Sequence, residues 1–231
     1  MEQEAGCPVS LAKLRWYAAR LAAMSPPEIV HRLREAGLKH SARRNRRGWA
    51  GFAATPGPLA DLAGLRRRLA AGAMPGRDRQ VPGSYHGLGQ SVDAALGAQA
   101  FHLDPVHRSL WPGAGTYCFD IDVRSTGETC GDVKFVWEIN RMQFLHPVAA
   151  AIAADPDERL VDEAFAVLEA WAAANPPFTG VNWFSGIELA MRMVTFTLLA
   201  AAIGPERMGA ARTALLGRLV AAHAFWLHRY P

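Results

Sequence analysis

Apolar side chains recur at helical spacing through the second half of the chain. Between residues 158 and 174 they fall on one face of a helix, opposite a row of acidic side chains. The apolar face consists of Leu160, Val161, Ala164, Phe165, Leu168 and Trp171. Breaks that contain proline or glycine separate such runs and predict four helices, over residues 132–153, 158–174, 186–203 and 205–230. Short connections make consecutive helices antiparallel neighbours, which is typical of helical hairpins stacked into an arc or toroid.

The first half has weaker patterns. Residues 11–24 are amphipathic, and Ser25-Pro26-Pro27-Glu28 has capping-box spacing, which predicts a helix running towards Lys39. An arginine-rich linker to residue 57 and a short helix over 59–71 follow. Residues 74–131 are rich in glycine and proline and predict a long irregular segment of the kind that lines a binding site. We therefore expect N-terminal helices with a basic linker over 1–57, and a helical domain over 58–231.

Composition supports a mostly α fold. Half of the 231 residues are apolar, alanine is abundant, and the formal net charge is +4. The arginines cluster at 43–47 and 66–68, which fits an anionic polysaccharide, a nucleic acid or an acidic membrane surface, but fits solvated helix ends and loops better. Nucleic-acid binding is disfavoured, because no recognition-helix or aromatic-platform motif accompanies these charges.

Several other classes find no support in the sequence. No zinc-protease, phosphate-loop, dinucleotide or nucleophile-elbow motif is present, and the three cysteines form no CxxC pair, so we expect no metal and no cofactor. The N-terminus has no stretch of signal-peptide type. The longest apolar run, 193–203, is far short of the roughly 20 residues that span a membrane, so we expect no membrane span.

A first group of candidate binding residues lies near the start of the helix predicted over 132–153. Lys134, Glu138 and Arg141 are spaced to lie along one stripe, beside Trp137 and Asn140. Such a stripe is either a row of surface ion pairs, each worth under about 1 kcal/mol, or the lining of a binding site. The neighbouring tryptophan and asparagine favour the binding site.

A second group lies where the helix over 186–203 begins, after Asn182 and Trp183. This helix is apolar almost all round. Its polar stripe consists of Ser185, Glu188, Arg192 and Thr195. Ser185 and Glu188 have capping-box spacing, and Glu188 and Arg192 are spaced to pair with each other. Because buried charges are costly unless they are paired, a structural ion pair and a site-lining role both stay open.

These motifs together resemble a known family. They are Asp132-Val-Lys134-Phe-Val-Trp137-Glu138-Ile-Asn140-Arg141, then Trp171 with Asn175-Pro176-Pro177, then Gly180-Val-Asn182-Trp183 through Ser185, Glu188 and Arg192. Phe101-His-Leu-Asp104-Pro105, Leu110-Trp111-Pro112 and Asp120-Ile121-Asp122 precede them. In this order they resemble the helical N-terminal domain of heparinase II/III-type polysaccharide lyases, over residues 100–231 and more loosely over 24–34.

The resemblance implies an incomplete (α/α) toroid over 58–231 that binds an anionic polysaccharide in the periplasm or cell envelope. The polymer is heparin-like, alginate-like or an exopolysaccharide, and the reaction is β-elimination at a uronic acid. Family members add a C-terminal β-sandwich and a catalytic Asn or His with a Tyr–His pair, all of which we expect to lie outside this sequence. The alternative is a non-catalytic helical carbohydrate-binding or scaffold module.

The resemblance also implies roles for individual side chains. Lys134, Arg141 and Arg192 would offer positive charge to the polymer, and Trp137 and Trp183 would stack on sugar faces. Hydrogen bonds to hydroxyl groups would come from Asn140, Asn182 and Glu188, with Glu138 on the same stripe. None of the four tyrosines or eight histidines in this sequence stands at a catalytic spacing.

Overall fold

The computed structural model describes residues 15, 18–20, 22–44, 48–52, 62–74 and 76–230. The chain divides into two compact units, Met1–Asn45 and Arg46–Pro231. In the first unit, helix α2 (Pro26–Arg44) begins at the predicted proline, runs five residues beyond the expected end at Lys39, and has no buried residue. Half of the amphipathic stretch over 11–24, and the expected boundary at residue 57, lie outside the described residues.

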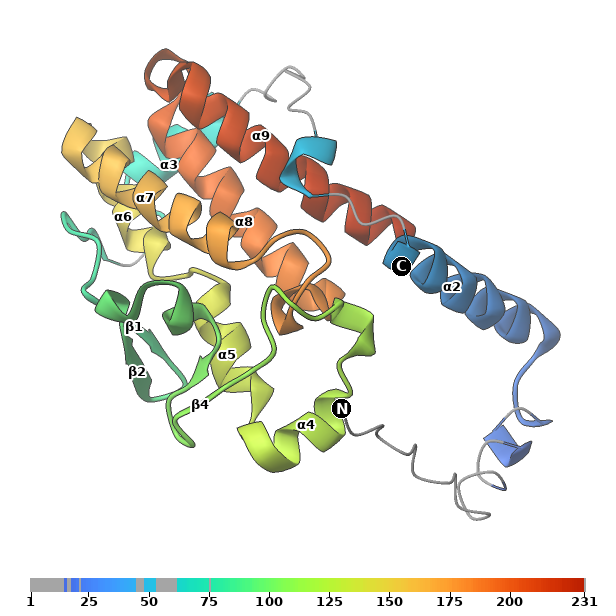
Figure 1. Ribbon diagram of the computed structural model, residues 1–231. Helices are drawn as coiled ribbons and strands as arrows, with labels where there is room; N and C mark the ends of the chain where they lie inside the picture. Colours follow the sequence, from blue (N-terminus) through green and yellow to red (C-terminus); the bar gives the residue numbers. More distant parts are fainter. Residues whose placement is uncertain are drawn as a thin grey trace. The chain divides into compact units, whose positions relative to one another are not determined.

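The second unit is mostly helical (Figure 1). Its α-helices are α3 (Ala63–Ala70), α4 (Val123–Cys130), α5 (Val133–Asn140), α6 (Leu145–Ala154), α7 (Glu158–Ala174), α8 (Gly186–Ile203) and α9 (Pro205–Arg229). Its 3-10 turns are η1 (Trp49–Gly51), η2 (Ala94–Phe101), η3 (Cys118–Asp120) and η4 (Val181–Trp183). Two antiparallel hairpins complete it, β1 (Ser84–Gly87) with β2 (Gln90–Asp93) and β3 (Leu103–Asp104) with β4 (Ser109–Leu110).

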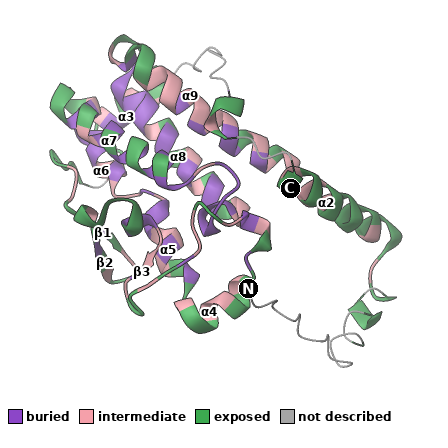
Figure 2. Ribbon diagram, viewed as in Figure 1, coloured by how far each residue is buried: buried purple, intermediate pink, exposed green. Residues whose placement is uncertain are grey.

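The longer helices pack side by side around α8, which contacts both α6 and α9, while α3 packs on α6 and α8 (Figure 1). Helices α7 and α8 have the predicted bounds. The apolar face predicted for α7 is buried throughout, and Leu160, Leu168 and Trp171 have no exposed surface. A fully buried leucine side chain contributes about 2 kcal/mol. Figure 2 shows the buried residues concentrated where these helices meet.

The helix predicted over 132–153 is instead two helices, α5 and α6, joined by a turn. Met142, in this turn, adopts φ 55° and is fully buried. The Arg141 carbonyl accepts a hydrogen bond from Thr195 Oγ1 on α8 at 2.9 Å. Contacts with α8 therefore end α5. The turn after α5 contains no glycine or proline, unlike the breaks that follow α7 and α8. In α9, by contrast, a glycine makes the break: Gly209 adopts φ 61° and ψ 170° and interrupts the helix that was predicted to be continuous.

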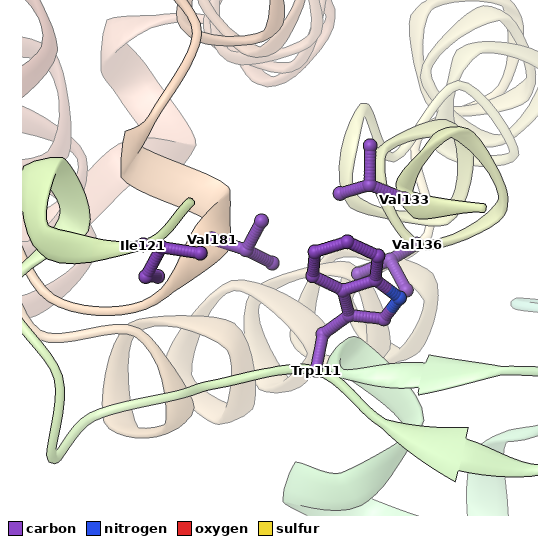
Figure 3. Packing of buried hydrophobic residues seen from close by; sticks show 5 residues of the cluster. All are labelled: Trp111, Ile121, Val133, Val136 and Val181. Atoms are coloured by element: carbon purple, nitrogen blue, oxygen red, sulfur yellow. The ribbon is translucent and has the colours of Figure 1, made fainter. Parts of the chain in front are cut away.

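The segment expected to be irregular, 74–131, is largely ordered by short elements. It contains both hairpins, η2, η3 and α4, whose first turn is capped by the Asp122 side chain at 3.1 Å from Arg124 N. Trp111, Ile121, Val133, Val136 and Val181 form an apolar cluster (Figure 3). Val123 and Cys130, at the two ends of α4, pack against it. This cluster attaches the segment to α5 and η4, which carry the candidate site.

Among the described helices, α8 is the one that is long and apolar enough to cross a membrane by length and composition. Within the protein 61% of this 18-residue helix is buried. A core helix of a globular domain passes the same test.

Candidate functional site

Three of the predicted site residues, Glu138, Arg141 and Glu188, meet where the end of α5 contacts the start of α8. Arg141 Nε and Nη2 donate to Glu188 Oε2 and Oε1 at 2.7 and 2.9 Å, a bidentate pair. Its Nη1 donates to Glu138 Oε2. The side chains of Arg141, Glu138 and Glu188 are 25%, 19% and 4% exposed. We call these three residues the Arg141 cluster.

The hydrogen bonds that Arg141 donates to Glu188 raise the pKa of Arg141, and the negative charges of Glu188 and Glu138 add to this effect. The cluster holds one cation and two carboxylates. The structure differs from two expectations drawn from the sequence. Glu188 pairs with Arg141 rather than with Arg192, and Ser185 precedes α8 without a side-chain capping bond.

Two residues outside the predicted set extend the cluster. Thr195 Oγ1 donates its proton to the Arg141 carbonyl at 2.9 Å and lies 2.8 Å from His146 Nε2. Because the hydroxyl proton is already used, Thr195 accepts from His146, which leaves His146 Nδ1 as the acceptor nitrogen. Burial lowers the pKa of His146. Thr195 belongs to the polar stripe visible in the sequence, whereas His146, a histidine among apolar residues, gave no signal.

Trp137 and Lys134 flank the cluster on α5. Trp137 is half-buried, donates from Nε1 to the Val181 carbonyl at 3.1 Å, and stacks on Phe184 with an interplanar angle of 17°. Lys134 is 73% exposed, and its Nζ lies 3.8 Å from the Asp132 carboxylate. On the other side, a Cβ built on Gly87 would lie 2.6 Å from Glu138 Cγ, so only glycine lets β1 pack this closely.

The predicted asparagines are structural in this chain. Asn140 Nδ2 donates to the carbonyls of Phe101 at 2.8 Å and Val136 at 2.7 Å, and its Oδ1 accepts from Trp171 Nε1 at 2.8 Å. Asn182 Nδ2 donates to the same Phe101 carbonyl at 2.9 Å. Both side chains are fully buried, so they hold η2 against α5 and η4 rather than facing a ligand.

Trp183 and Arg192 are also in the core. Trp183 has no exposed surface, and its Nε1 donates to the Asn175 carbonyl at 3.1 Å. Arg192 donates from Nε to His223 Nε2 at 2.9 Å and from Nη2 to the Asn182 carbonyl at 2.5 Å. Its guanidinium carbon lies 5.0 Å from the Trp171 ring centroid. Neither Trp183 nor Arg192 is within reach of a polymer in solution.

Burial shapes the ionisation of this internal pair. It lowers the pKa of Arg192 to about 9 and, together with the charge of Arg192, lowers the pKa of His223 well below its usual value. His223 is therefore a neutral acceptor for Arg192, with its Nδ1 bonded to the Leu219 carbonyl at 2.8 Å. Arg192 Nη1 has no hydrogen-bond partner among the described residues.

A separate polar pair lies in the turn between β3 and β4. The buried Asp104 carboxylate accepts from the backbone N–H groups of Val106 and His107 at 2.7 and 3.0 Å, and lies 3.2 Å from His107 Nδ1. These bonds account for both residues as a turn-forming unit. In the described part of the chain, no three His, Cys, Asp or Glu side chains are grouped to hold a metal ion.

No known protein family, curated protein or solved structure matches this chain.

Proposed function

We propose that the chain is the substrate-cradling, helical N-terminal part of a polysaccharide lyase that acts by β-elimination on a uronic-acid-containing polymer, in the periplasm or cell envelope. The resemblance of its ordered motifs to heparinase II/III-type lyases supports this proposal. The side-by-side helical hairpins α6–α7 and α8–α9 also support it, because an incomplete (α/α) toroid is built from such pairs.

The observation that carries the proposal is the Arg141 cluster beside the half-buried Trp137 ring. Three charged side chains from two helices are held rigidly at a partly exposed position, supported from beneath by Thr195. Carbohydrate sites commonly combine a flat aromatic side chain with fixed polar groups. A purely structural ion pair would need neither the exposed edge nor the aromatic neighbour.

The structure reassigns the positive charges within this proposal. Arg192 is buried, and Arg141 is neutralised by two carboxylates, so neither offers free charge to an anionic polymer. Lys134 remains, because its side chain is 73% exposed and its ion pair with Asp132, at 3.8 Å, is open to solvent and therefore weak. We therefore assign electrostatic attraction of the polymer to Lys134 and ring stacking to Trp137.

β-Elimination needs a base for the C5 proton, an acid for the leaving oxygen, and a group that neutralises the uronate. Burial raises the pKa values of Tyr85, Tyr117 and Tyr230, so these tyrosines stay protonated near neutral pH. These three tyrosines are therefore poor bases. We assign no base for the C5 proton among the described residues, and the proposal is that this chain binds polymer without cleaving it.

The test is to incubate the chain with heparin, alginate and a glucuronate-containing exopolysaccharide. Calorimetry measures binding, and ultraviolet absorbance detects unsaturated uronate products. We expect binding of at least one polymer with no rise in absorbance. Lys134→Ala and Trp137→Ala should each weaken binding about tenfold, the effect of losing one contact of about 1.4 kcal/mol. Arg67→Ala, on the exposed face of α3, is the matched control and should bind normally.

The second candidate is a non-catalytic helical scaffold, favoured by the burial of Asn140, Asn182 and Arg192. In that case Lys134→Ala and Trp137→Ala would change no affinity, because no polymer binds to the folded chain.

A further inference from the structure

Helix α2 of the first unit carries apolar side chains that nothing in the described part of that unit covers. None of its 19 residues is buried, and Figure 2 shows most of the helix as exposed. The large side chains of Val30 and Leu33 are 64% and 68% exposed. Most helices in proteins are stabilised by packing an apolar face rather than by their own hydrogen bonds, so an uncovered apolar face calls for a partner.

The apolar side chains of α2 lie along one stripe. Ile29, Val30, Leu33, Ala36 and Gly37 recur at the spacing that places residues on one side of a helix. The two small residues follow the three aliphatic ones, so the stripe is most apolar in the first half of the helix. Contact with a surface would therefore be made there.

The charged side chains are ordered around this stripe. Arg32 and Arg34 stand directly before and after Leu33, and because a helix turns by about 100° per residue, they flank the stripe on its two sides. Glu28 and Glu35 lie towards the opposite side of the helix. Glu28 pairs with Arg32, and these side chains are 44% and 49% exposed, so the pair is weak and leaves the arginine available to an external anion.

The balance of charge on α2 favours an anionic partner. The helix carries five arginine and lysine side chains against two carboxylates, with Arg43 and Arg44 in its last turn. Cations beside an exposed aliphatic stripe are typical of helices that lie in the interface of an anionic membrane. A nucleic acid would pair with the cations but would leave the aliphatic side chains in water.

We propose that α2 binds the surface of an anionic lipid bilayer. Ile29, Val30 and Leu33 insert between the lipid headgroups, while Arg32 and Arg34 bind lipid phosphates on either side of the stripe. The carboxylates of the helix face water. This inference goes beyond the proposed function and does not depend on polymer binding.

The test uses the whole chain and vesicles of mixed phosphatidylglycerol and phosphatidylcholine, with sedimentation to measure binding. We expect binding to the mixed vesicles and at least about tenfold weaker binding to pure phosphatidylcholine, because each cation near an anionic surface adds to the affinity. Leu33→Ala should weaken binding to the mixed vesicles about tenfold, because it removes apolar surface that the bilayer buries. Alanine is the best helix former, so this variant keeps the helix.

Leu38→Ala is the matched control. It makes the same change on the same helix, five positions on and therefore about 140° away from Leu33, so it should bind the mixed vesicles normally. Equal losses in Leu33→Ala and Leu38→Ala would overturn the proposal, because the effect would not belong to the stripe. Failure of the natural chain to bind mixed vesicles would overturn it as well, while the polymer assay on Lys134 and Trp137 would be unaffected.

Arg34→Gln separates the bilayer from other anions. It should weaken binding to the mixed vesicles about fivefold and leave the weak binding to phosphatidylcholine unchanged. If Arg34→Gln weakens vesicle binding but Leu33→Ala does not, the stripe is not inserted and the proposal is wrong. Binding to a DNA duplex with that same pattern, without binding to vesicles, would assign α2 to nucleic acid instead.

Discussion

The side chain of Asn140 makes three hydrogen bonds inside the protein, to Phe101, Val136 and Trp171. An asparagine next to an arginine in a helical stripe reads from sequence as a ligand-binding group. Its position relative to the turn of α5 depends on η2, which approaches from 39 residues away in the chain. The sequence therefore marks Asn140 as a candidate, but the local pattern cannot predict that its side chain is buried.

Replacing Asn140 with leucine should lower the free energy of unfolding by about 2–3 kcal/mol, because Trp171 Nε1 loses its acceptor and the Phe101 carbonyl keeps only Asn182. Chemical denaturation measures the loss. Lys134→Ala, on the exposed face of the same helix, is the control and should change stability by less than about 0.5 kcal/mol. A similar small effect of Asn140→Leu would show that the internal bonds contribute no net stability.

His223 makes a prediction about pH. Its pKa in the folded state lies well below the ordinary histidine value of 6.5, because the side chain is buried beside the charge of Arg192, so the unfolded chain binds this proton more readily. Stability is therefore fully present above about pH 6.5 and falls as pH decreases below it, by at most about 1.4 kcal/mol per pH unit for this group. Burial lowers the pKa values of His102 and His146 as well, so the losses have the same sign.

The variant His223→Gln isolates this residue, because the glutamine oxygen can accept from Arg192 Nε but does not titrate. Melting temperatures measured from about pH 7.5 to about pH 5 should fall less steeply in the variant than in the natural chain. Parallel curves would assign the acid sensitivity to His102 and His146 instead.

At the scale of elements, predictions succeeded where the chain itself carries the stop signal. Helices α7 and α8 end at Asn175-Pro176-Pro177 and at Gly204-Pro205, and both have the predicted bounds. The break between α5 and α6 was missed, because Met142 carries no such signal and its left-handed conformation depends on contacts from α8.

Pairing partners show the same limit. Helical spacing places Glu188 beside Arg192, but the structure joins Glu188 to Arg141, 47 residues away in the chain. The guanidinium of Arg192 already donates to His223 and to the Asn182 carbonyl. Glu188 therefore pairs with Arg141, which binds its carboxylate through two hydrogen bonds. Helical spacing alone gives the candidates for an ion pair, and the tertiary fold selects among them.

Gly131 connects α4 to α5 and illustrates a backbone requirement. It adopts φ +85°, and a Cβ built on it would lie 2.1 Å from Asp104 Oδ2. Gly131→Ala should lower the free energy of unfolding by about 3 kcal/mol, because backbone strain and the clash add. Gly83→Ala is the matched control: its added Cβ meets nothing within 4 Å, so denaturation should show little change. Equal effects at both positions would contradict this account.

At the scale of the second unit, a short turn near its N-terminal end closes over the aromatic core. Trp49, in η1, donates from Nε1 to the Ala172 carbonyl at 2.8 Å, across 123 residues of sequence. Its ring lies 6.5 Å from that of Trp171 and 6.0 Å from that of Trp183. This residue falls within the stretch expected to be a basic linker, where a lone tryptophan gave no sign of a long-range contact.

Two substitutions at Trp49 separate its hydrogen bond from its packing. Trp49→Phe keeps an aromatic ring and loses the bond to Ala172, so unfolding free energy should fall by about 1 kcal/mol. Trp49→Ala also removes the ring from Trp171 and Trp183, and the loss should reach about 3 kcal/mol. Chemical denaturation measures both, with Leu88→Ala, 57% exposed, as the control. If Trp49→Phe were as destabilising as Trp49→Ala, the hydrogen bond rather than the ring contacts would hold η1 against the core.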